Sequence, residues 1–175
     1  VPTPFMITPM SRLSLGVELA ALAVAAPISA DWPATGRAIY VPFVLAESVT
    51  VVKLLQRHGS SGGSPTIDVG IYNSAFARLV SSGNTAQPNT DILQEFDVTD
   101  TAMGPGQFYL GILGLTVATI AAKSFAWLAG DAATCKALGL LQEAGLSALP
   151  ATATPVVVTS DFIPFVGLSL RTLVA

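Results

Sequence analysis

Charged side chains are scarce in this chain. Lys, Arg, Asp and Glu together make up 11% of its 175 residues, against about a quarter in an ordinary soluble domain. With a mean hydropathy of +0.64, the chain has too few charges to cover a single globule of this size. Part of its surface must therefore be covered, either by lipid or by other protein subunits.

A hydrophobic run long enough to span a membrane is also missing. The longest uncharged apolar run, residues 108–122, has about 15 residues, and a spanning helix needs roughly 20. The run contains Gly111, Gly114 and several β-branched residues, a composition that suits strands buried on both faces. We therefore expect other subunits to cover the surface, and we expect no membrane partner.

The residues that usually carry chemistry are nearly absent. His58 is the single histidine and Cys135 the single cysteine, which excludes an intrachain disulfide and a zinc site built from several histidines and cysteines. His58 lies in a glycine-rich loop whose serines are too close in sequence to form a catalytic triad with it. The eight basic residues are scattered singly, so we expect no nucleic-acid partner. We predict no catalytic residue and no cofactor, and we interpret Cys135 as a buried structural thiol.

One acidic group stands out. Asp91, Glu95, Asp97 and Asp100 lie close together, and in an alternating strand Glu95 and Asp97 share a face. Such carboxylates could bind a hard cation, but the interpretation we favour is a solvated strand face followed by an Asp-capped turn. The metal prediction is therefore none, with cation binding by Asp97 and Asp100 left open.

The N-terminal segment resembles a signal peptide without meeting its requirements. Glu18 interrupts the apolar stretch between Met10 and Asp31, and Ile28 is too large for the position two residues before Ala30. We therefore expect this segment to belong to the mature protein. The predicted domains are an N-terminal arm at residues 1–30, held against a neighbour, and a single folded domain at residues 31–175.

The rest of the chain consists mainly of short alternating segments. Ile39, Val41, Phe43 and Leu45 share one face of a predicted strand, and Pro42 on the other face places this strand at an edge or beside a bulge. In residues 48–57 the alternation changes phase, which indicates a bulge or a strand buried on both sides.

A hairpin is predicted in "TIDVGIYNSAFARLVSSG", residues 66–83, with "NSA" as its turn and with Asp68 and Arg78 on the solvent-exposed face. Residues 131–150 show no clear period, and we expect a long loop with one helical turn near residues 140–144. About eight strands with turn signals between them favour an all-β fold, an antiparallel β-sandwich of the jelly-roll kind with an extended N-terminal arm.

Three segments carry a resemblance to a known group of proteins. "DVGIYNSAFARLVSSGNTAQ", "LQEFDVTDTAMGPGQFYLGI" and "LPATATPVVVTSDFIPFVGLSLR" resemble segments of jelly-roll or β-sandwich modules in the structural proteins of tailed bacteriophages. The resemblance implies a non-enzymatic component of the virion, such as a capsid decoration protein, a head-fibre base or a tail part. It supplies no functional residues.

The function predicted from these observations is particle stabilisation by a capsid decoration, or cement, protein. We expect a homo-oligomer, specifically a trimer, that packs against other virion proteins such as the major capsid protein after assembly in the host cytoplasm. The alternative is a tail, baseplate or head-fibre module that recognises host surface glycan through loops and an exposed aromatic such as Trp32 or Trp127. The predicted interface residues are Phe5, Met6, Leu13, Leu15, Val17, Leu19 and Leu22 in the arm, and Phe162, Phe165 and Leu168 near the C-terminus.

Overall fold

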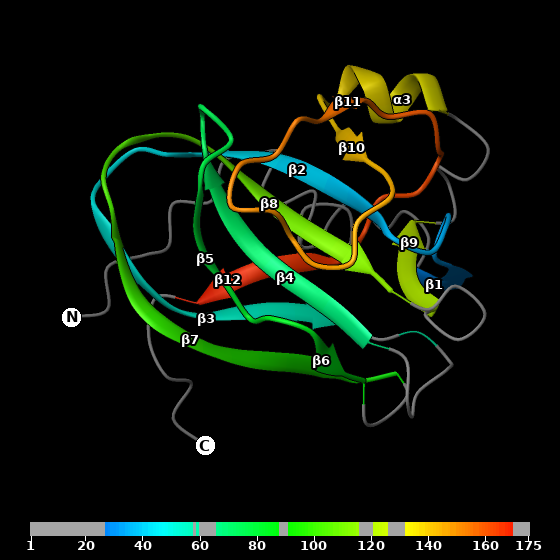
Figure 1. The fold of residues 1–175 in the computed structure, drawn as a ribbon, viewed down its shortest axis with the longest axis horizontal. Helices are drawn as coiled ribbons and strands as arrows, with labels where there is room; N and C mark the ends of the chain where they lie inside the picture. Colours follow the sequence, from blue (N-terminus) through cyan, green and yellow to red (C-terminus); the bar gives the residue numbers. More distant parts are fainter. Residues whose placement is uncertain are drawn as a thin grey trace.

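The fold is an antiparallel β-sandwich, as the sequence predicts. The computed structural model describes residues 27–57, 59, 66–87, 91–115, 121–125 and 132–169, and two sheets pack against each other in it (Figure 1). The elements are β1 (Pro27–Asp31), β2 (Arg37–Leu45), β3 (Val49–Arg57), β4 (Thr66–Asn73), β5 (Arg78–Ser81), β6 (Thr85–Ala86), β7 (Leu93–Met103), β8 (Gly106–Gly114), β9 (Ala121–Phe125), α3 (Ala132–Ala137), β10 (Leu141–Glu143), β11 (Val156–Val157) and β12 (Val166–Ser169).

The strand order places two consecutive strand pairs in different sheets, β2 with β8 and β3 with β7. The larger sheet has the order β11-β10-β2-β8-β4-β5, with β6 also beside β4, and the smaller sheet has the order β12-β3-β7. The consecutive strands β2 and β3 lie in different sheets and pair with β8 and β7 respectively. This arrangement gives the sandwich its jelly-roll character.

The strand β1 contains residues that the sequence assigns to the N-terminal arm. Pro27–Asp31 pairs in antiparallel fashion with β9, so the last four residues of the predicted arm are part of a two-stranded sheet. The remaining arm residues, 1–26, and His58 lie outside the described residues.

The alternation in β2 places its apolar side chains in the core as predicted. Ile39, Val41, Phe43 and Leu45 are all buried between the sheets. On the other side of this strand, β10 pairs only with residues 38–40, so Pro42 lies beyond that pairing. A missing N–H costs no ladder hydrogen bond at such a position, which explains why a proline is accepted in this strand.

The predicted change of phase in β3 is a β-bulge. The register of β3 against β7 shifts between Val51 and Lys53. Because the extra residue reverses the alternation, Val51 and Leu54 both point into the core although three positions separate them. The same shift leaves Lys53 on the outer face of the smaller sheet.

The predicted hairpin is formed by β4 and β5, and Asn73 organises its turn. The Asn73 Oδ1 atom accepts hydrogen bonds from the backbone N–H groups of Ala75 and Ala77, each at 3.0 Å. The prediction that Asp68 lies on a solvent-exposed face is wrong, because its side chain is 1% exposed.

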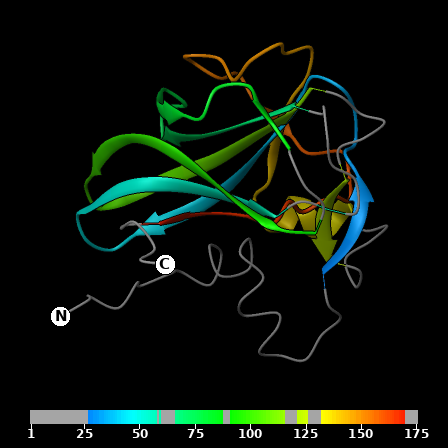
Figure 2. The same cartoon turned by 90° about the horizontal axis from the view of Figure 1, so that it is seen from below.

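The reason is a segment that covers the outer face of the larger sheet. Residues 144–155, called here the cover segment, lie across this face in Figure 2, on the side opposite the smaller sheet. Backbone hydrogen bonds hold the segment, among them Leu146 N–H to Gly36 O at 2.9 Å and Ala153 N–H to Phe76 O at 2.9 Å. A second apolar cluster is buried beneath it, made of Ala38, Tyr40, Tyr72, Leu113, Leu149 and Ala153.

The predicted helical turn near residues 140–144 is wrong, because the helix lies at residues 132–137. The helix is α3, earlier in the chain than expected, and residues 141–143 instead form β10, which extends the larger sheet beside β2. Cys135 in α3 and Leu140 after it are both buried in the main core. Cys135 is therefore buried, as predicted.

Candidate functional site

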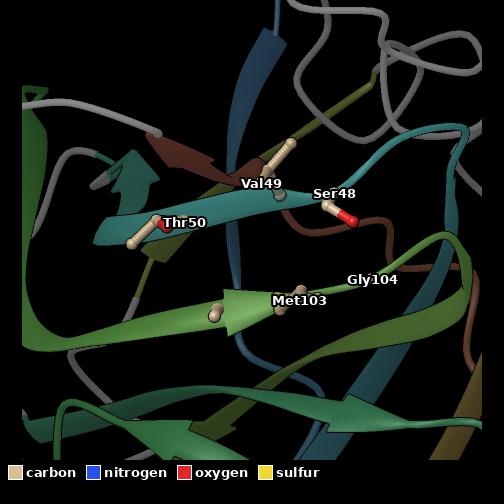
Figure 3. Close-up of a pocket in the computed structure, with 6 residues that line it drawn as sticks. Ser48, Val49, Thr50, Met103 and Gly104 are labelled. Atoms are coloured by element: carbon tan, nitrogen blue, oxygen red, sulfur yellow. The ribbon is translucent and has the colours of Figure 1, made fainter.

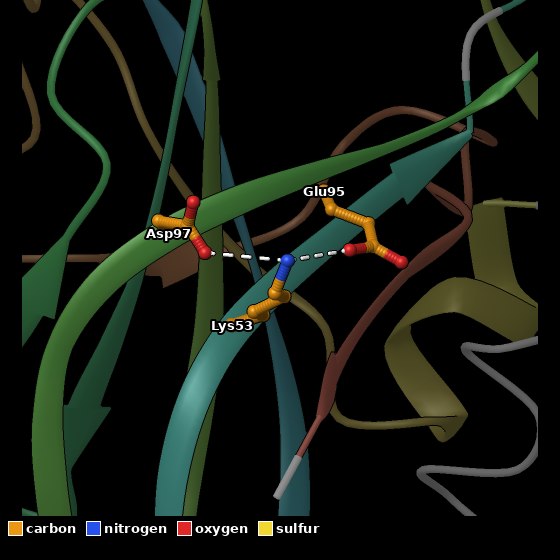
Figure 4. A network of polar contacts seen from close by, with 3 residues as sticks. All are labelled: Lys53, Glu95 and Asp97. Carbon is orange, nitrogen blue, oxygen red and sulfur yellow. Dashed lines mark hydrogen bonds and ion pairs between the residues drawn. The ribbon is translucent and has the colours of Figure 1, made fainter. Parts of the chain in front are cut away.

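The predicted acidic group is paired with a lysine. Lys53 on β3 lies opposite Asp97 on β7, and its Nζ atom lies 2.8 Å from Glu95 Oε2 and 3.3 Å from Asp97 Oδ1 (Figure 4). Glu95 and Asp97 therefore share a face of the strand, as predicted. Hydrogen bonds to Glu95 and then to Asp97 raise the pKa of the Lys53 ammonium above its usual value.

This pairing fits a strand face better than a cation site. The ammonium of Lys53 lies between the two carboxylates, where a hard cation would have to bind. Asp100, on the same strand, is exposed. Within the part of the chain that the structure describes, no three His, Cys, Asp or Glu side chains gather where they could hold a metal ion.

The aromatic shelf that glycan recognition would need is not provided by Trp32. Its side chain is 1% exposed, its Nε1–H donates to Arg37 O at 2.9 Å, and its ring packs edge-to-face against Phe162 at a centroid distance of 5.1 Å. Tyr40 and Tyr72 are also fully buried. Trp127, the other predicted candidate, lies outside the described residues.

A buried polar cluster ties the cover segment to β4 and β5. The Leu149 N–H donates to Asp68 Oδ2 at 3.0 Å, Arg78 donates to Leu149 O, and the Tyr72 hydroxyl donates to Pro150 O at 2.8 Å. Burial raises the pKa of the Asp68 carboxyl above its usual range, against the opposing effects of the Leu149 N–H and the Arg78 charge. These groups hold backbone atoms, so their role is structural.

Glu143 at the end of β10 anchors the other end of the cover segment. Its Oε2 atom accepts from the Tyr40 hydroxyl at 3.0 Å and from the Thr154 N–H at 3.1 Å, and its Oε1 atom accepts from the Thr154 hydroxyl at 3.0 Å. Burial raises the pKa of Tyr40 far above its usual value, so the phenol remains a donor. Every partner of this carboxylate is thus a group that fixes the fold.

A shallow depression lies where β3 begins and β7 ends (Figure 3). Its volume is about 290 Å³, and it is lined by Ser48, Val49, Thr50, Ala102, Met103 and Gly104. The lining contains two hydroxyl groups and no ionisable side chain. It can accommodate an apolar side chain, but it offers no group for general acid–base catalysis.

The predicted C-terminal interface residues pack inside the chain itself. Phe162 is 4% and Leu168 is 7% exposed, and Phe165 is half-buried against the same core. Their apolar surface therefore stabilises the sandwich of their own chain. The predicted arm residues Phe5, Met6, Leu13, Leu15, Val17, Leu19 and Leu22 lie outside the described residues.

The apolar side chains that the fold leaves exposed are a different set. Among the large apolar side chains that the structure describes, they are Val44, Leu79, Ile92, Leu93, Val156 and Val157. The two most exposed are Val156, at 61%, and Val157, at 55%, and both lie on β11, an outermost strand of the larger sheet. The predicted interface residues do not include any of them. The run "PVVVTS", which has no charge, was the available signal.

No protein-family model matches this chain, and no curated protein or solved structure matches it. None of the helices in the described residues has the length and apolar character to cross a membrane.

Proposed function

We propose that this chain is a non-enzymatic structural component of a tailed-phage virion, a capsid decoration protein that stabilises the particle by packing against copies of itself and against the major capsid protein. The observation that carries the proposal is the low charge content of a chain that folds as a β-sandwich. Only 19 residues of 175 are charged, and six large apolar side chains of the described residues are exposed. Such a surface is suited to burial by other subunits.

The mechanism of stabilisation would be the burial of surface. Removing apolar surface from water stabilises an assembly by about 25 cal/mol per Å², and a stable contact buries roughly 800 Å² on each partner. The charged groups of the described residues that could oppose such burial are partly neutralised within the chain, as in the contacts of Lys53 with Glu95 and Asp97. Packing of this kind requires no catalytic group.

The N-terminal arm is the element proposed to attach the chain to the particle. Its function can be tested by deleting residues 1–26 and adding the purified chain to particles assembled without it. The deletion ends before Pro27, because Pro27–Asp31 is paired with β9 and its loss would disturb the fold. A matched control replaces residues 1–26 with a Gly/Ser segment of equal length.

We expect both variants to have the same free energy of unfolding as the full chain. We expect both to lose attachment, measured as the amount of chain bound after the particles are sedimented. Full attachment of both variants would contradict the role of the arm. If the intact chain itself fails to bind such particles, the proposed function is wrong.

A further inference from the structure

The cover segment is attached to the larger sheet at separate points rather than by a strand. Residues 144–155 contain no helix or strand, and one bridge joins Thr152 to Ala77. Further contacts are single backbone hydrogen bonds, such as Arg78 N–H to Ala151 O at 2.8 Å. A segment held in this way can open locally while the rest of a domain stays folded.

The segment lies so close to the sheet that it keeps water from Asp68. A Cβ atom at Gly70 would be 3.0 Å from Leu149 Cδ1, and one at Gly36 would be 2.7 Å from Leu146 O. Asp68 lies two residues before Gly70 on β4 and therefore points to the same face, where its side chain is 1% exposed. The closed segment thus removes this carboxyl group from water.

The Asp68 carboxyl group lacks the partners that a buried carboxylate needs. Its Oδ2 atom accepts from the Leu149 N–H at 3.0 Å, but Oδ1 has no hydrogen-bond partner among the described residues. The Arg78 side chain donates to Leu149 O rather than to this carboxyl group. Because a buried charge without full pairing is costly, burial raises the pKa of Asp68. The Leu149 N–H, the Arg78 charge and, with smaller effects, the Gly83 N–H and the Ser81 hydroxyl oppose this rise only in part.

The other ionisable groups that face Asp68 do not change their charge in the same pH range. Arg78 on β5 is always protonated. Burial raises the pKa of Tyr72 on β4 above its usual value, so its hydroxyl stays neutral and remains a donor. Glu143 lies at the other end of the segment, where it accepts from the Thr154 N–H. Asp68 is therefore the group that titrates beneath the segment.

We propose that the cover segment is a pH-sensitive device, closed over the larger sheet while Asp68 is protonated and opening locally more readily once Asp68 is ionised. In the open state water reaches the carboxylate. The opening also uncovers the apolar cluster beneath the segment, which includes Tyr40 and Leu113. This inference goes beyond the proposed function and does not depend on it.

The direction of the effect follows from the two environments of the carboxyl group. In the open state it is in water, where an Asp has a pKa of about 3.9, and in the closed state the pKa of Asp68 is higher. The stabilisation of the closed state by the proton is therefore complete below the open-state pKa and is lost as the pH rises through the closed-state pKa. Between these two values, the ratio of open to closed chains rises about tenfold for each pH unit.

Hydrogen exchange in the full chain tests this device at the amides of Leu146 and Ala153, which donate to Gly36 O and Phe76 O. Their protection, relative to a free amide at the same pH, is measured from about pH 4 to about pH 8. We expect the protection to fall by about tenfold per pH unit between the two pKa values and then to level off. Protection that stays constant over this range would overturn the inference.

Low concentrations of urea distinguish opening of the segment from unfolding of the whole chain. Local opening exposes little surface, so exchange at Leu146 and Ala153 should hardly respond to urea, whereas exchange in the central strand β8 should respond strongly. Equal protection and equal urea dependence in the two places would mean that the segment opens only when the sandwich unfolds, and the proposed device would then be wrong.

Two matched variants identify the group responsible. Asp68→Asn keeps an oxygen for the Leu149 N–H but cannot ionise, so protection of the segment should no longer vary with pH. Glu143→Gln removes the charge of the other carboxylate that holds the segment, and it should keep the pH dependence. The inference fails if Asp68→Asn shows the same fall in protection as the full chain.

Arg78→Gln gives a readout that the loss of a contact alone would not change. The positive charge of Arg78 lowers the pKa of Asp68, so its removal should extend the fall in protection to higher pH. Loss of the contact with Leu149 O would lower protection at every pH without moving the end of the fall. A fall that ends at the same pH as in the full chain would contradict ionisation of Asp68 as its cause.

Discussion

Gly114 at the end of β8 allows the ring of Trp32 to pack directly against the strand backbone. Gly114 lies against the indole of Trp32, and a Cβ atom at this position would be 2.4 Å from Trp32 Cδ1. The ring cannot move aside easily, because it is buried, donates to Arg37 O and packs on Phe162. A glycine here is thus required by packing rather than by backbone conformation.

The substitution Gly114→Ala should therefore destabilise the chain. We expect a loss of about 1–3 kcal/mol in the free energy of unfolding, the usual cost of overpacking a core, measured by chemical denaturation. Gly104→Ala is the control, because a Cβ atom there meets nothing within 4 Å, and its effect should stay within about 0.5 kcal/mol. Equal effects of the two substitutions would show that the contact with Trp32 is not tight.

A second prediction at the residue scale concerns Asp68. Burial raises its pKa in the folded chain, so the folded state binds this proton more tightly than the unfolded state. Its contribution to stability is complete below the unfolded pKa of about 3.9 and is lost as the pH rises through the higher folded pKa. In Asp68→Asn, this decline in the free energy of unfolding should disappear, as measured by denaturation at a series of pH values.

The Asn side chain still offers an oxygen to the Leu149 N–H, so the variant should fold. Asp68→Ala removes that acceptor and should be less stable than Asp68→Asn by about 1–3 kcal/mol at every pH, because a buried N–H is left without a partner. A pH profile of Asp68→Asn identical to that of the unmodified chain would mean that this carboxyl does not titrate with folding.

Among the elements, the cover segment was the least predictable from sequence. The alternation of β2, the bulge of β3 and the β4–β5 hairpin follow from local apolar patterns, and all three were predicted. The cover segment has no period of its own. Its position depends on contacts of long sequence separation, such as Tyr72 with Pro150. The failed prediction for Asp68 has the same origin, because an alternating strand looks half-exposed until a remote segment covers its second face.

The substitution Tyr72→Phe tests how this segment is held. It removes the hydroxyl that donates to Pro150 O and keeps the ring that packs beneath the segment. We expect a loss of about 0.5–1.5 kcal/mol, typical of one hydrogen bond, and faster hydrogen exchange at the amides of Leu146 and Ala153. Tyr109→Phe is the matched control, because the Tyr109 hydroxyl makes an exposed contact with Gln107 at 2.9 Å. Unchanged exchange in Tyr72→Phe would show that other contacts hold the segment.

At the scale of the whole molecule, the fold class was predictable, whereas the division of apolar side chains between the core and the surface was only partly so. Strand alternation and turn signals are local, and they suffice for a β-sandwich. Whether an apolar residue serves its own core or a neighbour is not local. Phe162 and Leu168 were predicted at an interface and lie in the core, whereas Val156 and Val157 were not singled out and are exposed. The low charge content predicts that such surfaces exist, but the tertiary fold decides which residues form them.

The account depends most on the claim that copies of this chain cover one another. Sedimentation equilibrium of the full chain, followed through serial dilution at ordinary salt, tests this claim directly. We predict a mass at least twice the 17.9 kDa of one chain, which persists on dilution. A stable, monodisperse species with the mass of one chain would contradict it.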